Sequence, residues 1–92
     1  MNERAVHVFV TGLVQGVGFR YFTIRKAQAC GVKGYVRNCP DGRVEVWAEG
    51  PEERLQVLLK DLAKGPYSAR VDKLDIQRPE QLKGFRHFDV KF

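Results

Sequence analysis

Three glycines and an arginine lie close together in the segment Gly12–Arg20, which reads Gly-Leu-Val-Gln-Gly-Val-Gly-Phe-Arg. Glycines allow a backbone to curl so that several N–H groups point at one spot. A helix-like run follows, and a helix N-terminus adds unpaired N–H groups and a partial positive charge. Because Arg20 adds a planar fork of donors, the segment predicts a binding site for an oxyanion, with phosphate as the leading candidate.

This segment differs from the two common nucleotide-binding loops. A P-loop requires Lys-Ser or Lys-Thr after its last glycine, whereas Phe19 and Arg20 follow Gly18. A dinucleotide-binding fingerprint requires a third glycine at the position where Tyr21 stands. The loop residues alone therefore leave two interpretations open: an anion-binding loop, and a tight strand-to-helix turn that binds nothing.

Length and composition are those of a small globular protein. The 92 residues, 43% of them hydrophobic and 29% charged, predict a single domain over residues 1–92 with a small core of its own. No apolar run approaches the ~18 residues of a membrane span, and the N-terminus lacks a signal-peptide pattern. We therefore expect a cytoplasmic protein that works as a monomer and not at a membrane.

The formal net charge of +5 favours anionic partners such as phosphorylated metabolites, nucleic acids or acidic proteins. The basic residues are dispersed along the chain, so a simple nucleic-acid-binding tail is not expected. Cys30 and Cys39 have no zinc-site spacing to His7 or His87, and no metal site is predicted. In a reducing compartment both thiols are expected to stay free unless the fold brings them together.

Hydrophobic periodicity predicts the element order β-α-β-β-α-β with a short strand at the end. Alternating apolar residues indicate strands, and apolar residues spaced by three or four indicate helices. The turn Cys39–Gly42 carries an Asp-Gly tip that is typical of a hairpin. The expected strands are 5–11, 33–38, 43–49, 70–78 and 85–91, and the expected helices are 20–30 and 51–64.

This element order predicts an α+β protein with the ferredoxin-like βαββαβ arrangement, a four-to-five-stranded antiparallel sheet with two helices on one face. In that topology the first strand is central, and the third strand separates it from the second. The hairpin tip can still lie on the same side as the glycine-rich loop. Asn38, just before the hairpin, is therefore a candidate to face the loop; the alternative is that its side chain bonds to its own backbone.

Two segments of the chain resemble the signatures of the acylphosphatases. Gly12–Arg20 resembles the first, and Gly34–Glu45, which reads Gly-Tyr-Val-Arg-Asn-Cys-Pro-Asp-Gly-Arg-Val-Glu, resembles the second. The length, the element order and the helix start at Gly50–Glu52 also match the family. Two long motifs at the right separation are a far more specific signal than a lone glycine pattern.

The resemblance implies a small ferredoxin-like enzyme that hydrolyses the carboxyl-phosphate bond of acyl phosphates to a carboxylate and inorganic phosphate, without metal or cofactor. It implies that Arg20 and the loop amides bind the phosphoryl group and that Asn38 orients the attacking water. Convergent donors suit the charge of a transferring phosphoryl group, and the good leaving group makes a strong protein base unnecessary. The loop residues expected to bind phosphate are Gln15, Gly16, Val17, Gly18, Phe19 and Arg20.

The chain departs from the family pattern at two places. Tyr35 stands where the family often has tryptophan, which keeps an aromatic side chain. Val90–Phe92 stands where many members have an arginine and a tyrosine, so a contact between this segment and the site is left open. The physiological acyl phosphate is not predicted either, because the loop recognises only the phosphoryl group that all acyl phosphates share.

Other polar side chains are not expected to take part in the chemistry. His7 and His87 lie in strand-like runs away from both motifs. Glu45 and Glu49 are expected to face solvent, and Asp41 is expected to be a turn residue. The sequence therefore predicts no pair of carboxylates for general acid–base catalysis.

Two alternative functions belong to other classes. RRM domains share the topology and the basic charge, and Lys83–Phe88 superficially resembles the start of their RNP1 motif. That segment lies on the last strand, however, and Glu45 and Glu49 on the third strand would repel phosphates, so no nucleic-acid partner is expected. The other alternative is an accessory domain of a larger transferase that handles carbamoyl phosphate, which a chain that begins and ends with the domain disfavours.

Overall fold

A computed structural model describes residues 2–92 of the chain. All the predicted elements are present, with somewhat shifted boundaries. The elements in chain order are β1 (Glu3–Leu13), α1 (Phe19–Cys30), β2 (Lys33–Asn38), β3 (Val44–Pro51), α2 (Glu52–Lys64), β4 (Arg70–Gln77) and β5 (Phe88–Val90). Pro51 precedes α2 as its N-cap and is not its first helical residue. Within residues 2–92, neither helix has the length and apolarity that a membrane crossing requires.

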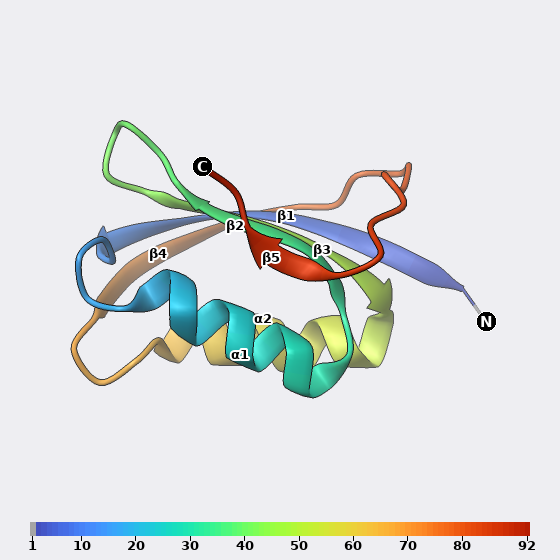
Figure 1. The fold of residues 1–92 in the computed structure, drawn as a ribbon, viewed down its shortest axis with the longest axis horizontal. Coiled ribbons are helices and arrows are strands. Elements are labelled where there is room, and N and C mark those ends of the chain that lie inside the picture. Colours follow the sequence, from blue (N-terminus) through green and yellow to red (C-terminus); the bar gives the residue numbers. More distant parts are fainter. Residues whose placement is uncertain (1) are drawn as a thin grey trace.

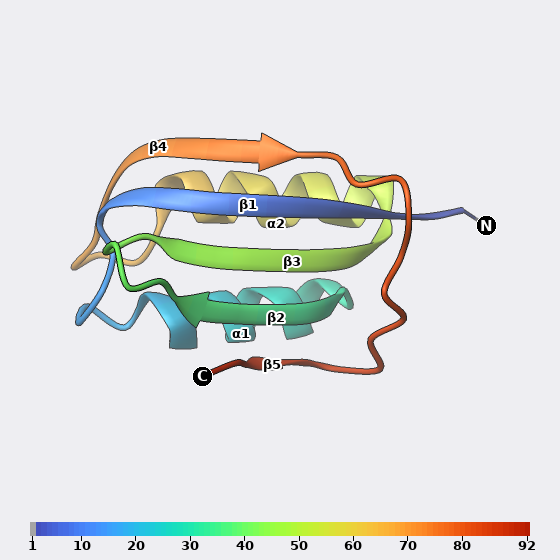
Figure 2. The ribbon, with the colours of Figure 1, turned by 90° about the horizontal axis from the view of Figure 1, so that it is seen from above.

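The sheet has the strand order β4-β1-β3-β2-β5, so β1 is central and β3 separates it from β2, as predicted (Figure 2). The first four strands pair antiparallel, but β5 pairs parallel with β2. The sheet is therefore mixed rather than wholly antiparallel. The reason is the crossing segment, residues 78–87, which leads from the β4 edge to the β2 edge at the end of the sheet where β2 begins (Figure 2). From there, β5 can only run in the direction of β2. The ferredoxin-like α+β prediction is confirmed.

Both helices cover one face of the sheet (Figure 1). The alternation in β1 and β3 directs one set of small apolar side chains to that face, and α2 adds a stripe of leucines spaced by three or four residues. Burial of each such side chain contributes roughly 1.5–3 kcal/mol. The fully buried residues of these elements include Val6, Val8, Val10, Val44, Val46, Ala48, Leu55, Leu58 and Leu62.

On the opposite face of the sheet, Asp75 and Gln77 of β4 are exposed, but the prediction that Glu45 and Glu49 face water is wrong. Glu49 is 2% exposed and Glu45 is 7% exposed. The crossing segment passes over this face (Figure 2). Its backbone amides at Lys83 and Gly84 donate to the carboxylate of Glu49, which also accepts a hydrogen bond from the Trp47 indole. Glu49 thus fastens the crossing segment to the sheet.

Glu45 is held by three side chains from neighbouring strands. His7 Nε2 lies 2.7 Å from its carboxylate, the Tyr35 hydroxyl donates at 2.7 Å, and Arg37 Nε also donates. Burial by itself raises the pKa of Glu45, but the hydrogen bonds from Tyr35, His7 and Arg37 outweigh it and lower the pKa to about 2. His7 is therefore a paired histidine on the sheet, as expected for a residue outside the chemistry.

Candidate active site

Three parts of the chain meet at one end of the sheet: the loop between β1 and α1, the end of β2 with the hairpin that follows, and the end of β5 (Figures 1 and 2). They enclose a pocket of about 300 Å³. The sequence-predicted residues Gly16, Gly18, Phe19, Arg20 and Asn38 all line it. The structure thus brings together the two motifs that the sequence analysis singled out.

The backbone of the loop has the form expected of an anion-binding turn. Gly16 has φ 74° and Gly18 has φ 79°, so both adopt the left-handed conformation that the glycines were predicted to supply. Both residues are exposed, and a Cβ at either would meet no atom within 4 Å. The backbone angle, and not lack of space, is therefore what favours glycine here. Val17 packs against the core and Phe19 is buried in it, so these two can offer an anion only their backbone N–H groups.

The N-terminus of α1 is free of competing groups. No side chain caps the helix, and its first turn holds no acidic residue. In contrast, α2 carries Glu52 and Glu53 in its first turn. Because the first N–H groups of a helix lack intrahelical partners and carry partial positive charge, the start of α1 suits an anion.

Arg20 lies in the first turn of α1, beside the loop. Its guanidinium Cζ is 5.7 Å from the ring centroid of Phe92. Within residues 2–92, Arg20 takes part in none of the ion pairs, whereas Arg37, Arg43 and Arg78 each hold a carboxylate. The Arg20 fork of donors thus faces the pocket without a competing carboxylate.

Asn38 is the last residue of β2. Val36 is buried on the helix side and Arg37 bonds to Glu45 on the other face, so alternation directs Asn38 to the helix side, where α1 begins. Asn38 Oδ1 is buried and accepts no hydrogen bond from any described residue. The bond to its own backbone, which was the alternative interpretation, is therefore not seen for this oxygen. A buried acceptor without a partner costs free energy and is well suited to a bound water.

The side chain of Gln15 connects the glycine-rich loop to the hairpin, and Gln15 is not among the residues that line the pocket. Its side-chain Nε2 donates to the backbone carbonyls of Cys39 and Arg43, at 2.8 Å each. The carbonyls belong to the hairpin that follows Asn38. Gln15 therefore ties the glycine-rich loop to the end of β2 and fixes the distance between the two halves of the pocket.

The remaining chemistry-bearing residues lie elsewhere. The cluster of His7, Tyr35 and Arg37 around Glu45 is on the sheet face away from the helices. Asp41 is a turn residue as predicted, since its carboxylate accepts from the backbone N–H of Arg43. Both cysteines are free thiols. Within the described part of the chain, no three His, Cys, Asp or Glu side chains gather to hold a metal ion.

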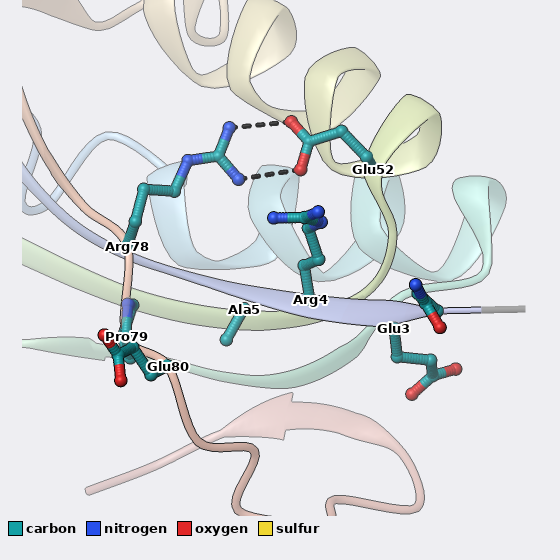
Figure 3. A pocket seen from close by; sticks show the side chains of 8 residues that line it. Glu3, Arg4, Ala5, Glu52, Arg78, Pro79 and Glu80 are labelled. Carbon is teal, nitrogen blue, oxygen red and sulfur yellow. Dashed lines mark hydrogen bonds and ion pairs between the residues drawn. The ribbon is translucent and has the colours of Figure 1, made fainter.

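A larger and more polar cavity lies at the opposite end of β1 (Figure 3). Its main feature is a two-point ion pair in which Arg78 donates to Glu52 at 2.9 and 2.7 Å. Glu52 occupies the donor fork of Arg78, and the three carboxylates of the lining outnumber its two guanidinium groups, so this cavity offers less to a phosphate than the Arg20 pocket. Its size therefore does not make it the better candidate.

A family model described as Acylphosphatase matches residues 6–90, a span that includes the loop, Arg20 and Asn38. The chain belongs to the acylphosphatase family. An acylphosphatase from Caldivirga maquilingensis is 47% identical over 88 residues, which cover 95% of this chain and 93% of that relative.

Solved structures agree with the acylphosphatase assignment. The crystal structure of an acylphosphatase from Bacillus subtilis superposes with a TM-score of 0.94 at 36% identity, over 97% of this chain and 99% of that one. A full-length HypF in its phosphate- and nucleotide-bound form matches with a TM-score of 0.92 at 26% identity, over 99% of this chain but 12% of HypF. The acylphosphatase fold therefore also occurs as one part of a much longer chain.

Sequence reasoning missed three residues of the pocket, which are Val14 after β1 and Tyr21 and Ile24 on α1. The contact that the sequence left open for the end of the chain is present, since Val90 and Phe92 also line the pocket. The spacing of Arg20, Tyr21 and Ile24 places them on neighbouring positions of one helix face, which the sequence could have indicated. The contribution of Val90 and Phe92 depends on the parallel pairing of β5, for which the sequence carried no signal.

Proposed function

We propose that this member of the acylphosphatase family hydrolyses acyl phosphates to a carboxylate and inorganic phosphate, with the phosphoryl group held at the start of α1. The observation that carries the proposal is the buried Oδ1 of Asn38, which has no hydrogen-bond partner within residues 2–92, on a residue that lines the same pocket as Arg20. An anion site and a water acceptor then face each other. This is the arrangement that water attack on a bound phosphoryl group requires.

The phosphoryl group binds to the backbone N–H groups of the loop Gln15–Arg20 and to the Arg20 fork. Negative charge spreads over the equatorial oxygens in the transition state, and preorganised donors stabilise it there. The left-handed angles of Gly16 and Gly18 and the uncapped start of α1 support this assignment. Asn38 Oδ1 accepts a hydrogen bond from the attacking water and orients its lone pair toward phosphorus.

The reaction needs no strong base from the protein. Water adds to phosphorus, the bond between phosphorus and the acyl oxygen breaks, and the carboxylate leaves with the electron pair. The proton of the water passes to solvent or product. Placement of the other titratable groups is consistent with this route, since His7 and Glu45 bond to each other on the far face of the sheet.

Small-molecule acyl phosphates, and not RNA, are the proposed partners. An RRM reads bases by stacking them on sheet aromatics. Here Tyr35 and Trp47 are buried on that face, and the Lys83 ammonium lies 4.3 Å from the centroid of the Trp47 ring. Bases have little aromatic surface to stack on.

We further propose that residues 1–92 work as one domain, as a monomer and in the cytoplasm. The support for the monomer is that the loop, Arg20 and Asn38 all come from one chain, so the pocket needs no second copy. Sedimentation at the enzyme's working concentration tests the oligomeric state, and fractionation of cells tests the location.

Phosphate release from benzoyl phosphate, measured in buffer with EDTA, tests the proposed function. We expect turnover that EDTA does not lower and that inorganic phosphate inhibits competitively. Absence of hydrolysis above the uncatalysed rate, with the protein folded by circular dichroism, would overturn the proposal. Tight binding of single-stranded RNA at moderate salt without hydrolysis would favour the RRM alternative instead.

A further inference from the structure

The pocket has two chemically different halves. One half holds the polar groups of the proposed phosphoryl site, Arg20, Asn38 and the glycine loop. The other half is an apolar wall formed by Tyr21 and Ile24 on α1, and by Val90 and Phe92 at the end of the β5 segment. The proposed hydrolysis uses the polar half and assigns no task to the apolar wall.

The parallel pairing of β5 is what puts this wall beside the reacting groups. Val36 of β2 pairs with Val90 of β5, and the Lys91 N–H donates to the Val36 carbonyl at 2.8 Å. Phe92 lies two residues beyond Val90, as Asn38 lies two residues beyond Val36. The two chains therefore carry Phe92 and Asn38 to the same end of the sheet, where Figure 1 shows the C-terminus.

The wall is apolar surface left open to water. Tyr21 is 68% exposed and Phe92 is 98% exposed, although both line the pocket. The Arg20 guanidinium lies 5.7 Å from the Phe92 ring, so the wall begins directly beside the proposed phosphoryl site. A group attached to the bound phosphoryl can reach the wall without a change in the fold.

The charge of the pocket limits what that group can be. Among its described lining residues, Arg20 is the one charged side chain. The phosphoryl group occupies it, so an acyl tail with its own carboxylate finds no second cation there. Apolar and aromatic tails gain binding free energy instead, because they remove the exposed surface of Tyr21 and Phe92 from water.

We infer that the wall of Tyr21, Ile24, Val90 and Phe92 is the acyl subsite of this enzyme, and that it favours acyl phosphates with uncharged apolar or aromatic tails over acetyl phosphate. This inference rests on the proposed function. The polar half of the pocket carries out the hydrolysis, and the apolar wall determines which acyl phosphate is preferred.

The test compares benzoyl phosphate with acetyl phosphate in the wild type and in Phe92→Ala, a substitution at an exposed residue that leaves the core untouched. Benzoate is a better leaving group than acetate, so the informative quantity is the change in the ratio of the two kcat/KM values, which cancels the difference between the leaving groups. One lost aromatic contact should lower kcat/KM for benzoyl phosphate about three- to tenfold more than for acetyl phosphate. Tyr67→Ala, at a fully exposed aromatic in the loop after α2, is the matched control and should leave the ratio of the two substrates unchanged.

An unchanged ratio of the two kcat/KM values in Phe92→Ala would overturn the inference. This holds if both values fall equally, which would show that Phe92 acts on the reaction through Arg20, and also if neither value falls. Binding of phenylphosphonate against methylphosphonate, measured by calorimetry, separates the inference from the proposed function. If the protein binds phenylphosphonate more tightly but hydrolyses neither benzoyl phosphate nor acetyl phosphate, the subsite is supported and the proposed hydrolysis is refuted. Equal affinities for the two phosphonates would refute the subsite.

Discussion

The side-chain amide of Gln15 donates a hydrogen bond to the backbone carbonyl of Cys39, the residue that follows Asn38. A second bond from the same nitrogen reaches Arg43 on the other side of the hairpin. Through this pair of contacts, the loop that carries the proposed phosphoryl site is fixed against the strand end that carries the proposed water acceptor. We therefore propose that Gln15 is a positioning residue, and its contribution should appear in the rate.

Gln15→Met keeps the length of the side chain and removes its donor. Each lost hydrogen bond should cost about 1 kcal/mol of stability. We expect kcat to fall roughly tenfold as the two halves of the pocket lose their spacing. The inhibition constant of phosphate should change little, because the loop amides and Arg20 remain. Gln56→Met, at an exposed position on α2, is the control. A lower melting temperature with unchanged kcat per folded molecule would mean that the bonds only stabilise the fold.

Arg20→Lys tests the two-point contact with the phosphoryl oxygens. A lysine ammonium keeps the charge but lacks the planar fork. We expect kcat/KM to fall by an amount equivalent to about 3–4 kcal/mol, by analogy with the loss of an oxyanion donor. Affinity for inorganic phosphate should fall as well. Arg54→Lys on α2 is the control, because it makes the same arginine-to-lysine substitution at a residue that does not line the pocket. Near-normal turnover in Arg20→Lys would remove Arg20 from the proposed mechanism.

The glycines of the loop can be tested against a glycine of the same geometry elsewhere. Gly16 has φ 74° and Gly84 has φ 82°, and a Cβ at either meets no atom within 4 Å. Alanine should therefore cause similar backbone strain at both positions, on the order of 1 kcal/mol. We expect Gly16→Ala to lower activity far more than Gly84→Ala. Equal effects on activity would indicate that the loop geometry matters only for stability.

The pH dependence of folding stability should show the contribution of the ionised Glu45 carboxylate. Its pKa is about 2 in the folded protein, against an ordinary value of 4.5. The ionised form is favoured by folding, so its contribution is complete above about pH 4.5 and is lost as the pH falls toward 2. Melting temperatures of Glu45→Gln should fall less steeply over this interval than those of the wild type, with the exposed Glu53→Gln as control. Parallel curves for wild type and Glu45→Gln would contradict the assignment.

The features that depend on residues close together in the sequence were predicted well. The alternating strand expected at residues 5–11 is present in β1, and its residues Val6, Val8 and Val10 are buried in the core. The positive φ angles of Gly16 and Gly18 follow from a tight turn between a strand and a helix, which is a local property. The two motifs could be identified as one candidate site because the expected topology allowed them to meet and because both resemble signatures of one family.

Features that depend on distant contacts were not predictable. Glu45 and Glu49 look solvent-facing by alternation, but Glu45 pairs with side chains of neighbouring strands, and the amides of the crossing segment bond to Glu49. The parallel pairing of β5 likewise depends on where that segment crosses. The position of Phe92 beside Arg20 follows from this pairing, so no local pattern could reveal it.

The most direct test of the central claim is the steady-state hydrolysis of benzoyl phosphate by Asn38→Ala, with kcat, the phosphate inhibition constant and the melting temperature measured on one preparation. If Asn38 Oδ1 orients the attacking water, kcat falls about 100-fold or more. The phosphate inhibition constant stays close to that of the wild type because Arg20 and the loop are intact. The melting temperature does not fall, since the substitution removes a buried acceptor that has no partner among the described residues. A stable variant with unchanged kcat would contradict the account and leave the water without a positioning group.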